Sequence, residues 1–430
     1  MPSRLNSKWY QRYVLVMAFI VVTLSLMDRY VVSILVEQIK DDLKLTDLQI
    51  GLLVGPAFVL VHVLTQLPLA RLADVANRRN MLAISLLMWS GFTLAAGFVK
   101  TFPMLLLTRM GVGITEAGCA PPLASLLSSY FPPEKRAKAM SVFTLGGVTG
   151  IGAGMLLGGI VGQEYGWRMA LIVAGAPGLL IAALFMLTVR EPHRSNAPAM
   201  GEEPGATHAS MSATLRIMFQ KKSFLWLLCG SSLVAVGALG RGVWEPAFLI
   251  RTFEMGQANA GLAYFLISPI PSMIGALCGG LLADRLCARD MRWCMWLPAT
   301  AMVAAFPFGV AFLLWPESHR FLATGIPVAF LFSIGASVLG GLASPVTIAT
   351  AQNLSPPHIR ATSHALWAIS TNLIGMGLGP LSAGYLSDYL QPSFGNDSLR
   401  YALTAVTSIS LLSAAFFIKG ARTIRNEIEH

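Results

Sequence analysis

The feature that most constrains this chain is a regular series of long apolar stretches separated by short polar segments. Of its 430 residues, 55% are hydrophobic and only 12% are charged, whereas soluble domains carry about 25% charged residues. Crossing a bilayer as an α-helix takes about 20 apolar residues. Twelve stretches of that length are centred near positions 25, 60, 90, 117, 150, 180, 235, 270, 303, 335, 373 and 409. The sequence therefore predicts an all-α membrane protein with twelve transmembrane helices.

The net charge of +10 encodes topology, and we expect no nucleic-acid binding from it. Most Lys and Arg residues fall in alternate connecting segments, including those around Arg78, Arg136 and Arg289. By the positive-inside rule, these segments and both termini are cytoplasmic. We therefore expect a multi-pass protein of the cell (inner) membrane. The first apolar stretch is too long for a cleaved signal and contains Asp28-Arg29, so we expect it to be a retained helix.

A weak internal repeat divides the chain. A polar segment, 191–214, separates a first bundle of six spans, 1–190, from a second, 215–430. The first half contains LAD at 72–74 followed by Arg78 and Arg79, and the second contains GLLADR at 280–285. Similarly, Ala120-Pro121 is matched by Ser344-Pro345. Parallel repeats of six spans are typical of one architecture of secondary transporters.

Several motifs give this chain a family resemblance. The loop at 70–82 resembles the signature between helices two and three of the major facilitator superfamily, and departs from it at Ala70, Val75 and Asn77. The segment 107–113 resembles the fourth-helix arginine motif, 146–159 the glycine-rich fifth helix, and 166–168 the usual start of helix six. The resemblance implies two pseudo-symmetric six-helix bundles. It also implies cytoplasmic gate contacts, which we expect to be stronger in the second half, from Asp74, Arg78, Asp284 and Arg285.

Six charged residues lie inside the predicted spans, where each costs about 2.5–3.5 kcal/mol on insertion scales. Three are positive and three are negative: Asp28, Arg29, Arg109, Glu116, Arg241 and Glu245. We expect them to converge as one neutral set. Arg109 and Glu116 share a helix face, and residues 241 and 245 can pair at i,i+4 spacing. Asp28 and Arg29 are about 100° apart around their helix, so one can line a cavity while the other pairs with a neighbouring helix.

Within the superfamily, the charges of helices one and four resemble those of bacterial spinster homologues. That resemblance implies proton-linked transport, by alternating access, of a lysophospholipid or sphingoid-phosphate-like anion. Arg29 would hold the anionic head and Arg109 would support it, while Asp28 and Glu116 would carry the proton. We expect a monomer that uses a proton gradient and needs no cofactor or metal.

The second half predicts a less polar wall for the same site. The repeat counterparts of Arg109 and Glu116 are Ser333 and Gly340, and the tenth span has no charge. Arg241 and Glu245 would be its charged contribution to substrate binding. An apolar lining would suit a hydrocarbon tail: Met255, Phe265, Met273, Phe332 and Trp367.

Other interpretations remain open at this point. The charges can form a static network that only fixes helix packing, above all at Arg241 and Glu245. The chain can export drugs or small organic anions with protons, or act as a non-transporting receptor or scaffold. We expect His62 to form a hydrogen bond between helices, and the five cysteines to be free thiols. The sequence lacks the ATP-binding and hydrolase motifs GxxxxGK[ST], HExxH and GxSxG, which argues against an enzyme.

Overall fold

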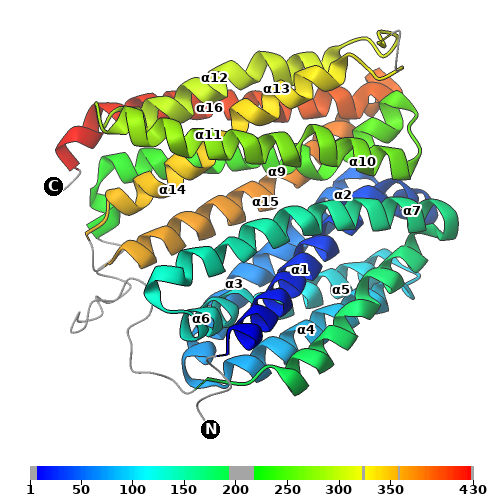
Figure 1. The fold of residues 1–430 in the computed structure, drawn as a ribbon. Coiled ribbons are helices and arrows are strands. Elements are labelled where there is room, and N and C mark those ends of the chain that lie inside the picture. The colour runs from blue at the N-terminus through cyan, green and yellow to red at the C-terminus, as the bar shows by residue number, and fades with distance from the viewer. Residues whose placement is uncertain (1–6, 193–216, 322–324, 357–358, 428–430) are drawn as a thin grey trace. The chain divides into compact units, whose positions relative to one another are not determined.

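A computed structural model describes residues 7–192, 217–321, 325–356 and 359–427. Within these ranges the chain is almost entirely helical (Figure 1). It forms two compact units, one from Met1–Met200 with Met255–Leu262 and the other from Gly201–Glu254 with Ala263–His430. The predicted connecting segment 191–214 lies outside the described residues from position 193 onward.

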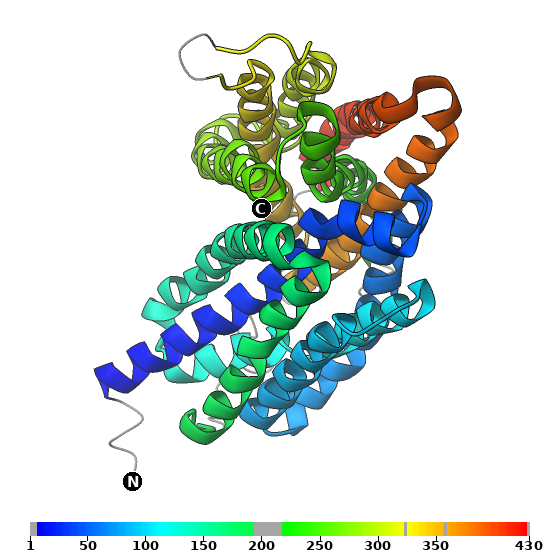
Figure 2. The ribbon, with the colours of Figure 1, turned by 90° about the vertical axis from the view of Figure 1, so that its right-hand side faces the viewer.

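The first unit contains seven labelled helices. They are α1 (Lys8–Leu43), α2 (Asp47–Val54), α3 (Pro56–Val75), α4 (Arg78–Ala96), α5 (Phe102–Glu116), α6 (Ala120–Tyr130) and α7 (Pro133–Thr188). Helix α7 is two helices in one, because Gly166 adopts a non-helical conformation with φ 82°, which favours glycine. Helix α1 packs along α7, and α4 packs on α5 and α7 (Figure 2).

The second unit repeats this pattern with α9 (Lys222–Phe253), α11 (Pro269–Cys287), α12 (Trp293–Leu314), α13 (Ala329–Gly341), α14 (Ala343–Asn353), α15 (Arg360–Phe394) and α16 (Ser398–Glu427). Helix α10 (Gln257–Ile267) begins in the first unit and ends in the second. Its Gln257 donates a 3.1 Å hydrogen bond to the Ile34 carbonyl of α1. The sequence division had placed residues 255–262 in the second bundle, whereas they pack with the first unit.

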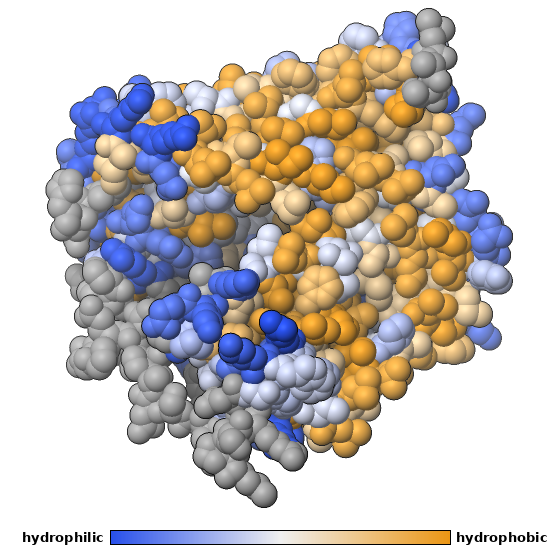
Figure 3. Space-filling model, viewed as in Figure 1, coloured by the Kyte–Doolittle hydropathy of each residue, from blue (hydrophilic) through white to orange (hydrophobic). Residues whose placement is uncertain are grey.

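Eight helical stretches in the described residues are long and apolar enough to cross a membrane. Two of them, Glu134–Thr188 and Thr362–Glu427, contain two helices each. Helix α4 and the α5–α6 pair occupy the positions of the two remaining predicted spans. Apolar side chains cover much of the face seen in Figure 3.

Four of the predicted spans are broken helices. In the first unit the breaks lie between α2 and α3, where Pro56 follows Gly55, and between α5 and α6, where Pro121 and Pro122 follow Cys119. The second unit has breaks between α10 and α11 at Ser268 and between α13 and α14 at Leu342. The repeat therefore extends to helix interruptions at corresponding places, which the sequence interpretation did not foresee.

Glycines let α1 and α7 approach closely. A Cβ atom added to Gly150 would lie 2.5 Å from the Thr23 carbonyl oxygen, and one added to Gly154 would lie 2.6 Å from the Met27 carbonyl oxygen. Both distances are far below normal contact, and both obstacles are backbone atoms that cannot rotate away. Close backbone approach through small residues is a general means of packing transmembrane helices. The close contact with α7 therefore fixes the position of α1 immediately before Asp28 and Arg29.

Polar contacts tie the second unit together near one end. Asp290, between α11 and α12, forms an ion pair of 2.5 Å with Arg425 of α16. The backbone N–H of Arg292 and the Arg425 side chain hold the pKa of Asp290 below its usual range. The carboxylate of Glu427 accepts bonds from the backbone N–H groups of Lys222 and Ser223 at the start of α9. These bonds satisfy donors that a helix N-terminus leaves free.

We predict that Gly154→Ala lowers the stability of the protein. The new methyl group forces α1 and α7 apart, and such overpacking typically costs about 1–3 kcal/mol. The midpoint of thermal unfolding in detergent, followed by tryptophan fluorescence, should fall. Gly147→Ala is the matched control, because a Cβ at Gly147 meets nothing within 4 Å, and its midpoint should stay the same or rise. Equal midpoints for both variants would contradict the packing argument.

Candidate functional site

The two adjacent charges of α1 point to different surroundings. Asp28 is buried, whereas 26% of the Arg29 side chain remains exposed. This division follows from their angular separation of about 100° around the helix. The sequence analysis expected one of the two to line a cavity and the other to pair with a neighbouring helix, whereas both pair with residues of α5.

Arg29 forms a close ion pair with Glu116, the last residue of α5. Its Nη2 lies 2.8 Å from Glu116 Oε1 and its Nε donates to the same oxygen at 2.9 Å. The Ser25 hydroxyl also donates to Oε1. The Glu116 side chain is only 2% exposed, and its second oxygen, Oε2, has no hydrogen-bond partner within the described chain. One carboxylate oxygen thus receives all the donors while the other is buried and unused.

An aromatic ring supports the exposed cation. The Arg29 guanidinium carbon lies 4.7 Å from the centroid of the Phe58 ring, on α3. A cation over an aromatic face at this distance gains about 0.5–2 kcal/mol, depending on its solvation. Phe58 can therefore hold the guanidinium even when its carboxylate partner is exchanged. Neither Ser25 nor Phe58 was singled out from the sequence, because an isolated serine or phenylalanine in an apolar helix carries no pattern.

Asp28 and Arg109 form a second, looser pair. Arg109 Nη1 lies 3.8 Å from Asp28 Oδ2, and both side chains are nearly fully buried. Among the described residues, neither Asp28 oxygen has a hydrogen-bond partner, nor do Nε and Nη2 of Arg109. Thr93 of α4 lies beside the Asp28 carboxylate. Because buried charges need hydrogen bonds to offset their desolvation, this pair is less well compensated than the pair of Arg29 and Glu116.

A helix break lies directly at this cluster. Helix α5 ends at Glu116, and the N–H of Ala117 bonds to the carbonyl of Thr115 instead of that of Gly113. Interrupted transmembrane helices with irregular backbone near the membrane centre typically mark the binding sites of secondary transporters. The corresponding break in the second unit follows Gly341, next to Gly340, the repeat counterpart of Glu116. The break thus distinguishes Glu116 from the other buried carboxylates.

The second unit has its own charged pair. Arg241 Nε lies 3.1 Å from Glu245 Oε2, as the i,i+4 spacing predicted. The Ser333 hydroxyl donates to Glu245 Oε1 at 3.1 Å, and Arg241 donates to Ser337 at 3.1 Å. Ser333 is the repeat counterpart of Arg109, so a hydroxyl takes the place of a guanidinium there. The predicted set of six charges is thus distributed as four in the first unit and two in the second, each paired within its own unit.

The predicted aromatic and apolar lining residues lie mainly in the second unit. The Trp367 ring stacks on His364 with centroids 5.8 Å apart and packs against a buried core of α9, α12 and α16. Phe332 of α13 contacts the Trp315 ring at 4.8 Å. Each is only partly buried, so each retains surface that a ligand can contact.

The predicted gate residues differ in their surroundings. Arg78 is buried and donates from Nε to Glu191 Oε1 at 2.7 Å and from Nη1 to the hydroxyls of Ser125 and Ser129. Glu191 Oε2 also accepts the backbone N–H of Arg79 at the start of α4. The side chain of Asp74 lies outside the described part of the structure. Asp284 and Arg285 are exposed at the end of α11.

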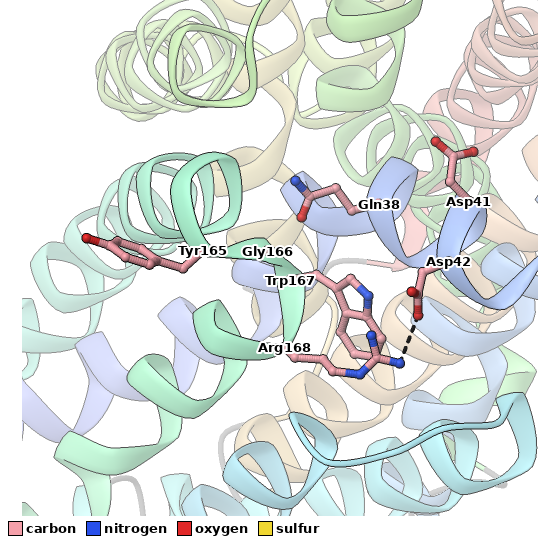
Figure 4. Close-up of a pocket in the computed structure, with 7 residues that line it drawn as sticks. All are labelled: Gln38, Asp41, Asp42, Tyr165, Gly166, Trp167 and Arg168. Atoms are coloured by element: carbon pink, nitrogen blue, oxygen red, sulfur yellow. Dashed lines mark ion pairs between the residues drawn. The ribbon is translucent and has the colours of Figure 1, made fainter.

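A separate hollow of about 540 Å³ opens elsewhere on the first unit (Figure 4). It is lined by Gln38, Asp41, Asp42, Tyr165, Gly166, Trp167 and Arg168. Arg168 bonds Asp42 at 2.8 Å, lies over the Trp167 ring at 4.3 Å, and donates to the Val99 carbonyl. The lining of this hollow contains none of the residues predicted to bind substrate or carry a proton. Its contacts fasten the Gly166 break of α7 to the end of α1.

Comparisons with known proteins identify the family of the chain. The family model of the Major Facilitator Superfamily matches residues 18–380. An MFS-type efflux pump of Mycolicibacterium smegmatis is 32% identical, over 95% of this chain and 92% of its own length. The zebrafish (Danio rerio) sphingosine-1-phosphate transporter SPNS2 is 26% identical, over 93% of this chain and 81% of its own length.

A solved structure is also similar. The crystal structure of a bacterial homologue of the human lysosomal transporter spinster, in an inward-facing and unoccupied conformation, matches with a TM-score of 0.89. The two chains are 26% identical, and the match covers 99% of each. These matches confirm the twelve-helix fold and the resemblance to spinster proteins, and they identify a transporter, not an enzyme. This multi-pass membrane protein belongs to the Major Facilitator Superfamily.

Proposed function

We propose that this transporter moves an amphiphilic anion, a lysophospholipid or sphingoid phosphate, and couples that movement to a proton. The observation that carries the proposal is the unequal burial of the Arg29–Glu116 pair. The guanidinium is partly exposed and supported by Phe58, whereas the carboxylate is enclosed and has one unused oxygen. An anionic head can therefore reach Arg29 without Glu116 having to move.

The pair gives a simple physical basis for coupling. A phosphate and Glu116 compete for the same guanidinium, whose planar fork suits either group. When the phosphate wins, Glu116 becomes a buried carboxylate without its counter-ion. Leaving such a charge uncompensated costs about 3–5 kcal/mol, so Glu116 takes up a proton instead. Binding of the anion and binding of the proton then favour each other.

Asp28 and Arg109 take a supporting role in this proposal. Their loose pair lies beside the first one in the same unit, and Arg109 is enclosed. Arg109 partly offsets the negative charge of Asp28 and adds positive potential near the head group. Asp28, with no hydrogen bond to either oxygen in the described residues, is the second candidate proton carrier. Arg241, Glu245 and Trp367 would contribute the second unit's share of substrate contacts.

The second unit supports an apolar tail in place of a second polar group. The position of Glu116 is taken by Gly340, where an added Cβ would meet nothing within 4 Å. The neighbouring positions on α13 hold apolar residues and two serines that are already bonded, Ser333 to Glu245 and Ser337 to Arg241. Such a wall can contact a hydrocarbon chain, whereas a sugar would lose hydrogen bonds there.

The relatives favour two substrate classes. SPNS2 is named a sphingosine-1-phosphate transporter, which supports the amphiphilic anion. The M. smegmatis relative is named an efflux pump, which supports the alternative of a proton-driven exporter of drugs or small organic anions. In either case we propose rocking of the two halves as a monomer in the cell (inner) membrane, with both termini cytoplasmic and with gate contacts at Asp74, Arg78, Asp284 and Arg285.

We predict that Arg29→Ala abolishes high-affinity binding of the anion. Hydrogen bonds to charged groups contribute about 1.5–3 kcal/mol, so the Kd for lysophosphatidylglycerol should rise about ten- to hundredfold. Titration calorimetry on detergent-purified protein measures this. Arg289→Ala removes an exposed arginine and should leave the Kd unchanged. An unchanged Kd in Arg29→Ala would remove Arg29 from the site.

We predict that Glu116→Gln uncouples binding from pH. In the wild-type protein, anion binding and proton uptake are linked through competition for Arg29, so the affinity for lysophosphatidylglycerol should rise as the pH falls. This phosphodiester keeps one charge throughout, so the effect belongs to the protein. Glutamine imitates the protonated acid, and Glu116→Gln should bind tightly at every pH tested. In proteoliposomes it should show no uptake driven by a pH gradient.

The same experiments separate the alternatives. A pH-dependent affinity that persists in Glu116→Gln would assign the proton to another group, with Asp28→Asn as the next variant. Transport of a small aromatic anion such as benzoate, with neither binding nor transport of lysophosphatidylglycerol, would favour the exporter of small organic anions. Binding without transport of any solute would favour a receptor.

A further inference from the structure

His62 of α3 is a half-buried titratable residue that the proposed mechanism does not use. Its Nδ1 lies 3.2 Å from the carbonyl oxygen of Gly113 on α5. This carbonyl is the one that the break at Glu116 deprives of its helical partner, since the N–H of Ala117 bonds to Thr115 instead. A bond between helices, as predicted from the sequence, therefore satisfies a backbone group that the break had left free.

The Gly113 bond determines the tautomer of His62. A carbonyl oxygen can only accept a hydrogen bond, so Nδ1 must carry the hydrogen. In a neutral imidazole the other nitrogen, Nε2, is then an acceptor with a free lone pair. Within the described chain, no protein group donates to Nε2. The site thus contains a neutral acceptor whose hydrogen-bonding direction is fixed by a backbone group.

His62 stands beside the proposed anion anchor. Its ring stacks on Phe58 with centroids 5.3 Å apart and planes 21° from parallel, and the same Phe58 ring lies 4.7 Å from the Arg29 guanidinium carbon. The imidazole and the guanidinium are therefore separated by no more than these two contacts together. A head group of a few bonds can span that separation, with its anionic oxygen on Arg29 and a neighbouring group at His62.

The charges nearby select the kind of group that Nε2 accepts from. The Arg29 guanidinium lies over the Phe58 ring on which the His62 ring stacks. A second cation at this point would be repelled by Arg29, whereas a neutral hydroxyl donor would not. The acceptor therefore suits a hydroxyl group better than an ammonium group.

We propose that His62 is a specificity-determining residue that accepts a hydrogen bond from a hydroxyl group next to the anionic head of the substrate. This inference rests on the proposed anion site at Arg29 and adds a second requirement to it. The protein would thereby distinguish a lysolipid with a free hydroxyl beside its phosphate from an otherwise equal lipid without one.

The test is a cycle of two ligands and two protein forms at one fixed pH. The ligands are 1-acyl lysophosphatidic acid and its 2-deoxy analogue, which differ by one hydroxyl group. His62→Phe keeps a ring to stack on Phe58 but has no acceptor. A neutral hydrogen bond contributes about 0.5–1.5 kcal/mol, so the wild-type protein should bind the hydroxyl ligand about three- to tenfold more tightly. In His62→Phe the two Kd values should become equal.

Two further variants control for folding. His62→Gln retains an acceptor and should keep part of the preference, whereas His319→Phe, which replaces a histidine beside Trp315 in the second unit, should keep all of it. Because the measured quantity is a ratio of two ligands on the same protein, a loss of stability in His62→Phe cancels.

The outcomes distinguish failure of the proposed role of His62 from failure of the proposed anion site at Arg29. If the wild-type protein binds both ligands equally, or if His62→Phe keeps the preference, His62 is only a helix-break cap and the inference is overturned while the anion site stands. If the wild-type protein binds neither ligand, the proposed function fails, and this inference fails with it.

Discussion

The charged site of the first unit depends on one contact, the ion pair between the partly exposed Arg29 and the buried Glu116. Each charge alone would be expensive in an apolar environment, and removing one partner leaves the other uncompensated. Helices α1 and α5 are therefore held together by a contact that is strong only while both charges persist. A single proton or a single competing anion changes that balance. The interaction that stabilises the fold locally is thus also the one that a transporter can switch.

The surroundings of this pair make the switch directional. Ser25 and Arg29 both donate to the same Glu116 oxygen, so the carboxylate is held by one atom while the other is free to receive a proton. The face of the Phe58 ring holds the Arg29 guanidinium, whichever anion binds the edge of the guanidinium. The helix break beyond Glu116 leaves the Gly113 carbonyl without its helical partner. His62 Nδ1 donates a hydrogen bond to this carbonyl. Three neighbouring helices thereby contribute to a single exchange site.

Much of this architecture could be predicted from the sequence. The apolar lengths gave the twelve spans, the positive segments gave an expected orientation, and the i,i+4 spacing anticipated the Arg241–Glu245 pair. Partners on different helices could not be predicted in this way. Nothing in the pattern around Glu191 indicates that it bonds Arg78, and nothing around Phe58 places it under Arg29. The break after Glu116 had a signal in Pro121 and Pro122, but its exact consequence, a free carbonyl at Gly113, requires the three-dimensional backbone.

The glycine contacts between α1 and α7 have a consequence for how this protein can evolve. Gly150 and Gly154 meet backbone atoms of α1, so neither glycine can acquire a side chain without moving the helix that carries Asp28 and Arg29. We expect variation in substrate preference at positions away from this contact, such as Phe58 and His62 on α3. The face of α1 that packs on Gly150 and Gly154 is held in place by close backbone contact. Residues that contact α1 elsewhere can change without this restriction. Families built on such a helix should diversify their substrates while keeping the position of the anchoring charge unchanged.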